Sequence, residues 1–191
     1  SRLPSGFFFS GLLFFPVFIA THWISIEAAG LIGIIIAVIS LVQIMTMPIG
    51  TLFLPIFAHL KKGNNINKLK EKTQDILDFV FTIPFIFGCL LLLFSNELVF
   101  LWFGPTYTSI TNEIRLLSVG VGFIIIFILL RSVIDGISNV PYVNIITFIS
   151  LIVFLLGIGL VGEHEISIRK IVIIFSLSIS VLGLISIYIL H

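Results

Sequence analysis

Two ionisable residues inside a long apolar run are the first candidates for chemistry in this sequence. Arg131 and Asp135 stand four residues apart, a spacing that puts both side chains on one face of a helix. A charged residue near the bilayer centre costs at least about 2.5 kcal/mol and usually faces protein or water. The pair is therefore open to two interpretations, a structural ion pair or part of a substrate-binding site. Arg131 could also extend its side chain to the lipid headgroups.

A stripe of polar residues is the second candidate. Ser40, Gln43 and Thr46 recur every three residues just before Pro48. Such a stripe can line an aqueous cavity or form hydrogen bonds to a neighbouring helix. Proline interrupts helical hydrogen bonding, and broken helices are common where transporters bind their substrates. Static helix bundles also tolerate proline, so Pro48 does not distinguish a transporter from a static bundle.

Motifs of enzymes and metal sites are absent from the sequence. It has no His-Glu-x-x-His, no Gly-x-Ser-x-Gly and no Gly-x-x-x-x-Gly-Lys pattern. The single cysteine, Cys89, lies in an apolar run and is interpreted as a small hydrophobic residue. The sequence therefore predicts a protein that is not an enzyme, with no cofactor and no metal. The four histidines are scattered along the chain, as His22, His59, His164 and His191.

The elements that position these residues must be membrane helices. Of 191 residues, 59% are apolar and 10% are charged, and the mean hydropathy is +1.28. A soluble domain carries about 25% charged residues, so most of this chain must face lipid. The net charge of +1 excludes nucleic-acid binding through a basic face. We expect a multi-pass protein of the plasma membrane.

Six apolar runs are long enough to cross a bilayer, which takes about 20 residues of helix. The runs are continuous and do not alternate with polar residues, which favours helices over a membrane barrel. The second run exceeds one crossing, and we interpret it as one helix kinked at Pro48. The predicted fold is an all-α polytopic bundle forming a single domain. Its six spans are residues 7–24, 28–60, 76–94, 114–138, 142–162 and 168–190.

The orientation follows from the linker at residues 61–75, because short cytoplasmic loops are rich in lysine and arginine. We therefore place this linker in the cytoplasm and, with six crossings, both termini as well. Arg169 and Lys170 are exceptions, at the predicted outer end of the sixth span. Asn64 or Asn65 is expected to cap a helix leading into the third span. The linker contains half of the basic residues, namely Lys61, Lys62, Lys68, Lys70 and Lys72.

The order of four short motifs resembles a known family. They are Arg-Leu-Pro-Ser-Gly-Phe at residues 2–7, Pro-Ile-Gly with Leu-Pro within residues 48–55, Leu-Trp-Phe-Gly-Pro-Thr-Tyr at residues 101–107, and Leu-Arg-Ser-Val-Ile-Asp-Gly at residues 130–136. Together they resemble the second half of polysaccharide-biosynthesis flippases. These belong to the multidrug, oligosaccharidyl-lipid and polysaccharide exporter superfamily. The resemblance covers nearly the whole chain.

The resemblance implies the C-terminal lobe of a two-lobe transporter, in which a central cavity opens alternately to either side of the membrane. The substrate would be a lipid-linked sugar. Arg131 would hold its phosphate, and Gln43, Ser40 and Thr46 would line the route. Asp135 would tune Arg131 or take part in ion coupling. The implied partners are membrane lipids and either a missing N-terminal lobe or a second copy of the chain, since both a fragment and a half-length protein fit the pattern.

Two alternatives stay open at this stage. One is a drug or cation antiporter lobe of the same superfamily, which would need a buried carboxylate, and Asp135 is the deepest candidate. The other is a membrane scaffold that transports nothing and binds polymer-assembly enzymes through the lysine-rich linker.

Overall fold

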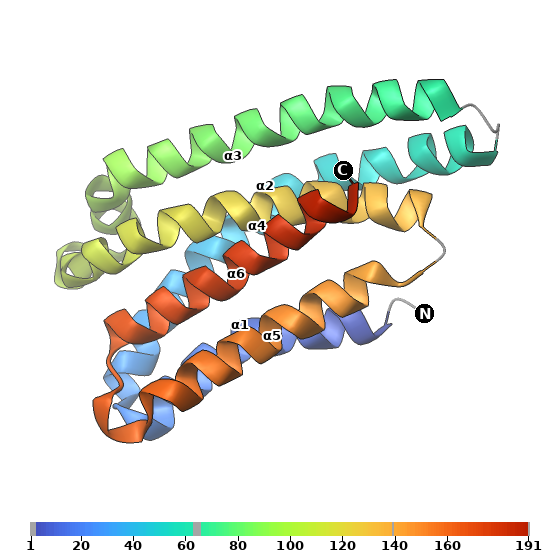
Figure 1. The fold of residues 1–191 in the computed structure, drawn as a ribbon. Coiled ribbons are helices and arrows are strands. Elements are labelled where there is room, and N and C mark those ends of the chain that lie inside the picture. The colour runs from blue at the N-terminus through green and yellow to red at the C-terminus, as the bar shows by residue number, and fades with distance from the viewer. Residues whose placement is uncertain (1–2, 63–65, 139, 191) are drawn as a thin grey trace.

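The computed structural model of this chain describes residues 3–62, 66–138 and 140–190. Its described residues form helices and short connections, without a strand. Two short 3-10 helices, η1 (Pro105–Ile110) and η2 (Glu163–Glu165), join longer helices. Six long helices make up the bundle in Figure 1, namely α1 (Leu3–Trp23), α2 (Ile26–Lys62), α3 (Ile66–Phe103), α4 (Thr111–Ile137), α5 (Tyr142–Val161) and α6 (Ile168–Leu190).

Each of the six long helices contains a stretch long and apolar enough to cross a membrane. This confirms the predicted all-α, six-span fold of a multi-pass membrane protein. The two ends of the chain lie at the same end of the bundle as the α2–α3 connection (Figure 1). An even number of crossings requires this arrangement. That this end faces the cytoplasm stays a prediction.

The third helix extends beyond the predicted span of residues 76–94 at both ends, and its first part is the helix expected to lead into this span. α3 begins at Ile66, so most of the predicted linker is helical, and its apolar stretch is Phe79–Phe103 rather than residues 76–94. The connection to the next helix is correspondingly shorter than the gap between the predicted spans 76–94 and 114–138. Asn96 stays in the helix, and its Oδ1 accepts a hydrogen bond of 3.4 Å from Thr111 Oγ1 of α4. The predicted caps at residues 64 and 65 lie outside the described residues.

Gly104 and Pro105 make the turn between α3 and η1. Gly104 has a φ of 88°, in the left-handed region that glycine adopts without strain. Pro105 then occupies the first position of η1, where its missing N–H needs no partner. The turn allows α4 to return antiparallel beside α3 (Figure 1).

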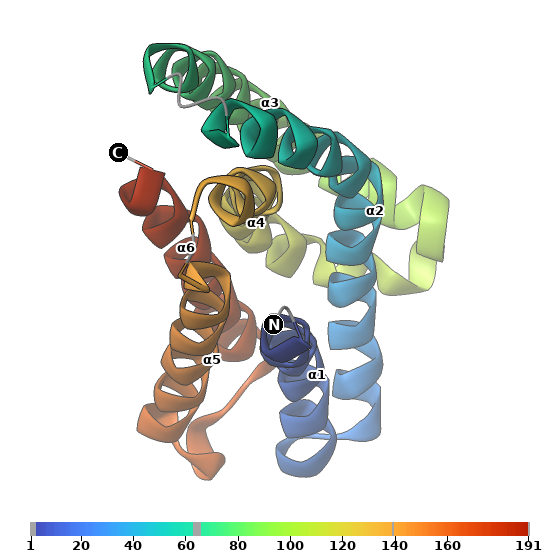
Figure 2. The same cartoon turned by 90° about the vertical axis from the view of Figure 1, so that its right-hand side faces the viewer.

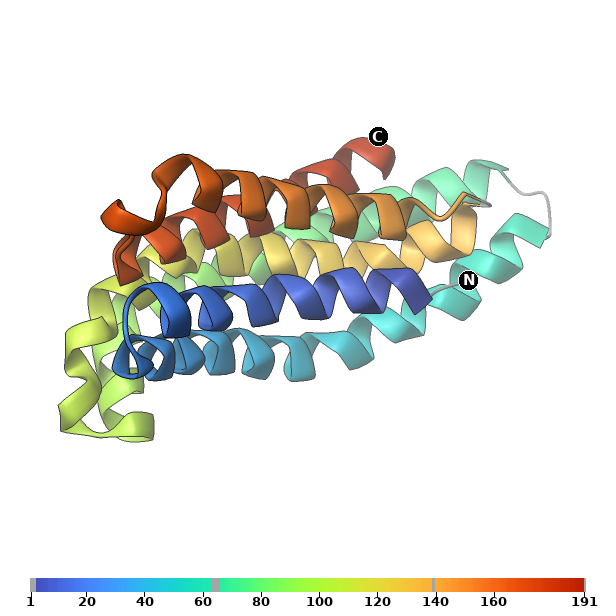
Figure 3. The ribbon, with the colours of Figure 1, turned by 90° about the horizontal axis from the view of Figure 1, so that it is seen from below.

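α2 is one continuous helix, as the sequence predicts for a single crossing, although Pro48 and Pro55 lie inside it. Proline removes a backbone donor and clashes with the carbonyl four residues earlier, which bends a helix. Figure 3 shows α2 changing direction in its second half. The first half packs beside α1, and α2 also packs on α4. α2 therefore diverges from α1 towards the end of the bundle that holds the N-terminus (Figure 1).

α4 is the central helix. It packs against α2, α3 and α6, whereas α1 packs between α2 and α5, and α5 packs against α6. Five helices thus form a ring, and α3 lies outside it on α4 (Figure 2). Within their apolar stretches, 67% of α4 is buried but only 22% of α3.

Close helix crossings hold α4 in place. A Cβ atom added at Gly50 of α2 would lie 2.8 Å from the carbonyl oxygen of Ile128, and one at Gly183 of α6 would lie 2.7 Å from that of Phe123. Lipid is as apolar as a leucine side chain, so membrane helices associate through close contact at small residues rather than through the hydrophobic effect. These crossings fix the rotation of α2 and α6 against α4.

Candidate functional site

A cavity of about 320 Å³ lies between α1, α2 and α4. This volume is at the lower end of the range for small-molecule sites, about 300 to 1,000 Å³. The cavity is lined by Phe9 of α1, by Gln43, Met47, Thr51 and Leu54 of α2, and by Phe127, Ile128, Arg131, Ser132 and Asp135 of α4.

Side-chain contacts between α1 and α4 form one wall. The rings of Phe9 and Phe127 stack with centroids 5.9 Å apart. One helical turn further along α4, Arg131 Nη2 donates a hydrogen bond of 3.4 Å to the Oγ of Ser5, which is buried. On the other side, the close contact of Gly50 with Ile128 joins α2 to α4. The cavity therefore has an aromatic part and a charged part.

Arg131 is the cation of the cavity. The hydrogen bond to Ser5 uses one of the five N–H donors of the guanidinium and exceeds the usual N–H···O distance of about 2.9 Å. Of the two interpretations, a direct ion pair between Arg131 and Asp135 is not found among the described residues, and Arg131 instead bonds to Ser5 of α1. Its guanidinium thus retains donors for an anionic ligand.

Asp135 lies one turn beyond Arg131 and lines the same cavity. The structure therefore brings both predicted ionisable residues to one site, as their four-residue spacing indicates. Both side chains are partly buried. The cavity carries charges of both signs within an otherwise apolar bundle.

Gln43 adds an amide to the cavity. Its Nε2 atom is buried and has no hydrogen-bond partner among the described residues. A buried donor left without a partner costs about 1 to 3 kcal/mol. The cavity is large enough to admit water or a polar ligand group, which needs only about 10 to 15 Å³. The Nε2 donor of Gln43 is thus placed to bond to a water molecule or to a polar group of a ligand in the cavity.

Ser40 and Thr46 do not line the cavity. The Ser40 hydroxyl donates to the carbonyl oxygen of Ile36 at 2.9 Å, and the Thr46 hydroxyl, which is buried, donates to that of Val42 at 2.8 Å. A helix turns about 100° per residue, so residues six positions apart point about 120° away from each other. Of the predicted stripe, only Gln43 reaches the site.

Sequence reasoning missed Thr51 and Ser132. Thr51 follows Gln43 and Met47 at intervals of four, the spacing that keeps side chains on one helix face, and this signal could have found it. Ser132 follows Arg131 directly and had no periodic signal. Phe9 and Phe127 are two of twenty phenylalanines, and nothing in the sequence distinguishes them.

No group of three or more His, Cys, Asp or Glu residues is placed to bind a metal ion in the described part of the chain. Comparison of the chain with known protein families, with curated proteins and with solved structures found no match in any of the three. The assignment of function therefore depends on the motifs of the sequence and on the cavity.

Proposed function

We propose that this chain is one lobe of a plasma-membrane transporter that flips or exports a lipid-linked oligosaccharide or polysaccharide precursor by alternating access. The observation that carries the proposal is the convergence of three of the four flippase-like motifs on one cavity. The first motif supplies Ser5, which accepts a hydrogen bond from Arg131. The second supplies Leu54, and the fourth supplies Arg131, Ser132 and Asp135.

The chemistry of the cavity suits the head of such a substrate. A pyrophosphate sugar must cross the hydrocarbon core in a polar site while its tail stays in lipid. A guanidinium forms paired, charge-assisted hydrogen bonds with phosphate oxygens, a role we assign to Arg131. Gln43 and Ser132 present an amide and a hydroxyl that suit a sugar, and the Thr51 hydroxyl, which donates to the carbonyl oxygen of Pro48 at 2.8 Å, can still accept a hydrogen bond.

The proposal also includes a partner lobe beside the cavity. Met47, one of the residues that line the cavity, is 59% exposed in the isolated chain, so this face is free to contact another lobe or lipid. A volume of about 320 Å³ accommodates part of a saccharide head. The remainder would occupy space shared with an N-terminal lobe or a second copy of the chain, and membrane lipids would surround both.

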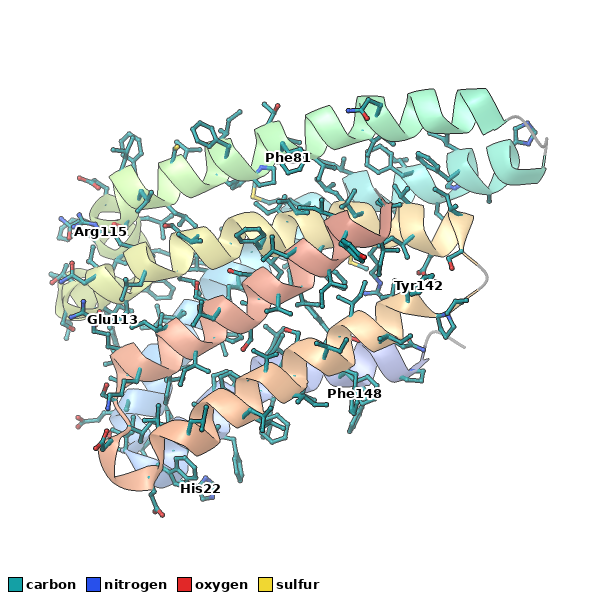
Figure 4. The ribbon with its side chains drawn as sticks, in the orientation of Figure 1. His22, Phe81, Glu113, Arg115, Tyr142 and Phe148 are labelled. Atoms are coloured by element: carbon teal, nitrogen blue, oxygen red, sulfur yellow. The ribbon has the colours of Figure 1, made fainter. Side chains whose placement is uncertain are left out.

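Substitution of Arg131 tests the proposal. In the full-length transporter, we expect Arg131→Ala to abolish movement of a labelled lipid-linked sugar across proteoliposomes, with membrane insertion intact. Arg131→Lys, which keeps the charge but loses the planar pair of donors, should retain part of the activity. The control is Arg115→Ala, which removes an arginine of α4 that does not line the cavity. Arg115 lies at the opposite end of the bundle from Tyr142 (Figure 4). Full transport by Arg131→Ala would assign Arg131 to structure alone.

One observation favours the antiporter alternative, namely that Asp135 lines the same cavity. An antiporter would couple transport to protonation of this carboxylate. Asp135→Asn would then abolish drug or cation exchange in vesicles with an imposed proton gradient, and the wild-type protein would not move a lipid-linked sugar. A scaffold would move neither substrate.

A further inference from the structure

A second hollow in the bundle lies between α3 and α4, about half a turn around α4 from the cavity. It has a volume of about 310 Å³. Gly122 lines it and Arg131 lines the cavity, and nine residues of helix separate their directions by about 180°. We infer that this groove binds one acyl chain of a membrane phospholipid. The site is independent of the transport function proposed above.

The walls of the groove have the character of hydrocarbon. Its rim carries large exposed side chains, including Phe85, which is 72% exposed, and Phe81, on α3 (Figure 4). Its floor is made by small residues, among them Gly88, Gly122 and Ser118. The Ser118 hydroxyl donates to the carbonyl oxygen of Arg115 at 2.7 Å, so it is already satisfied. A polar ligand would find no partner there, whereas an alkyl chain needs none.

α3 and α4 are in van der Waals contact along the groove, since a Cβ atom on Gly88 would lie 3.6 Å from the carbonyl oxygen of Ser118. A helix with its side chains is about 10 to 12 Å wide, whereas a chain of methylene groups is thin and flexible and can follow the seam between two touching helices. We therefore assign the groove to an acyl chain, and crosslinking to a second copy is an outcome of the crosslinking test.

The length of the groove matches one leaflet. The groove follows α3 from Phe81 to Leu92, a rise of about 16 Å at about 1.5 Å per residue. Half of a hydrocarbon core of about 30 Å is about 15 Å. The apolar stretch of α3 begins at Phe79, so the groove runs from one edge of the membrane to near its midplane. An acyl chain of the leaflet beside the α2–α3 connection follows this path.

The position of α3 gives the bound chain a structural role. α3 lies outside the ring, packs mainly on α4 and has the lowest buried share of the six spans. A chain in the groove would contact both helices and add the dispersion contacts that α3 lacks. The phospholipid would thus hold α3 against the ring.

Photo-crosslinking tests the inference directly. The full-length protein is placed in bilayers containing a phospholipid with a diazirine in the middle of one acyl chain. We expect the crosslinks to concentrate on residues 81–92 and 118–126. Crosslinks spread evenly over the exposed faces of α1, α3 and α5 would overturn the inference, as would displacement of the phospholipid by a polyprenyl phosphate or crosslinking to a second copy.

Native mass measurements with a pair of variants provide the second test. We expect the wild-type protein to leave mild detergent with one retained phospholipid, and Gly88→Leu, which fills the floor, to lose it. Gly159→Leu of α5 is the matched control, because no atom lies within 4 Å of an added Cβ there, and it should retain the lipid.

Cys89, the single cysteine, lines the groove. If Gly88→Leu fails to insert, alkylation of Cys89 in the folded protein with a bulky maleimide should displace the lipid. Retention of the lipid after either treatment contradicts the inference.

Discussion

Gly50 lies where α2 crosses α4 beside the cavity, and Gly50→Ala tests whether this crossing sets the geometry of the site. The added Cβ would lie 2.8 Å from the carbonyl oxygen of Ile128, whereas ordinary contact begins at 3.4 Å. The two helices must therefore separate by the difference, about 0.6 Å. Overpacking of this kind costs about 1 to 3 kcal/mol.

Helix propensity opposes this cost, so a matched control is needed. Alanine is favoured over glycine in a helix interior by about 1 kcal/mol. Gly33 lies in the same helix, and an added Cβ there meets no atom within 4 Å. Gly33→Ala should therefore gain propensity without a clash. The unfolding free energy of Gly50→Ala should fall below that of Gly33→Ala by about 1 to 3 kcal/mol, because the propensity cancels between the two.

Unfolding by sodium dodecyl sulfate, followed by circular dichroism in mixed micelles, measures this difference. Ile128 lines the cavity, so Gly50→Ala should also reduce transport at temperatures where the protein stays folded. Equal unfolding free energies for the two variants would refute the reasoning, since the close contact would then carry no energetic weight.

Three further predictions concern other parts of the chain. Gln43→Leu should leave the lobe at least as stable, because the buried Nε2 has no partner in the described chain, yet it should lower transport; a loss of unfolding free energy in detergent would contradict this. Ser150→Ala should destabilise the lobe by about 0.6 kcal/mol, typical of hydrogen bonds between membrane helices, because the Ser150 hydroxyl donates to the backbone carbonyl oxygen of Ser178 in α6. Ser178→Ala keeps that carbonyl and removes only a hydroxyl that bonds within its own helix, so it should cost less. Equal losses of unfolding free energy would argue against the bond between helices. Lys68→Cys in a Cys89→Ala background should react only with thiol reagents that enter the cytoplasm, and labelling only from outside would reverse the orientation.

Part of the candidate site could be predicted from sequence. Arg131 and Asp135 are ionisable residues within an apolar run, and their cost in lipid is a local property, so both were found and both line the cavity. The four-residue spacing allowed an ion pair but did not require one. Ser5, the hydrogen-bond partner of Arg131, lies 126 residues away in the chain, and no local pattern could have identified it.

The polar stripe of α2 shows a second limit of sequence reasoning. Regular spacing suggested that Ser40, Gln43 and Thr46 act together, but a period of three does not match the helical repeat of 3.6 residues. The rotation of α2 on α4 selects Gln43, Met47, Thr51 and Leu54 for the cavity. Hydroxyl groups can satisfy themselves within their own helix, as those of Ser40 and Thr46 do.

The sequence by itself determined that this protein crosses a membrane with six helices. In lipid every backbone polar group must be satisfied within its own segment, so length and hydropathy are sufficient to predict the number of spans, although the third span differs from its predicted bounds. The tertiary structure alone decided which polar residues share a cavity and where the lipid-facing groove lies. Both depend on how α2 and α3 are rotated and spaced against α4, which is set by contacts such as that of Gly50 with Ile128 between residues far apart in the chain.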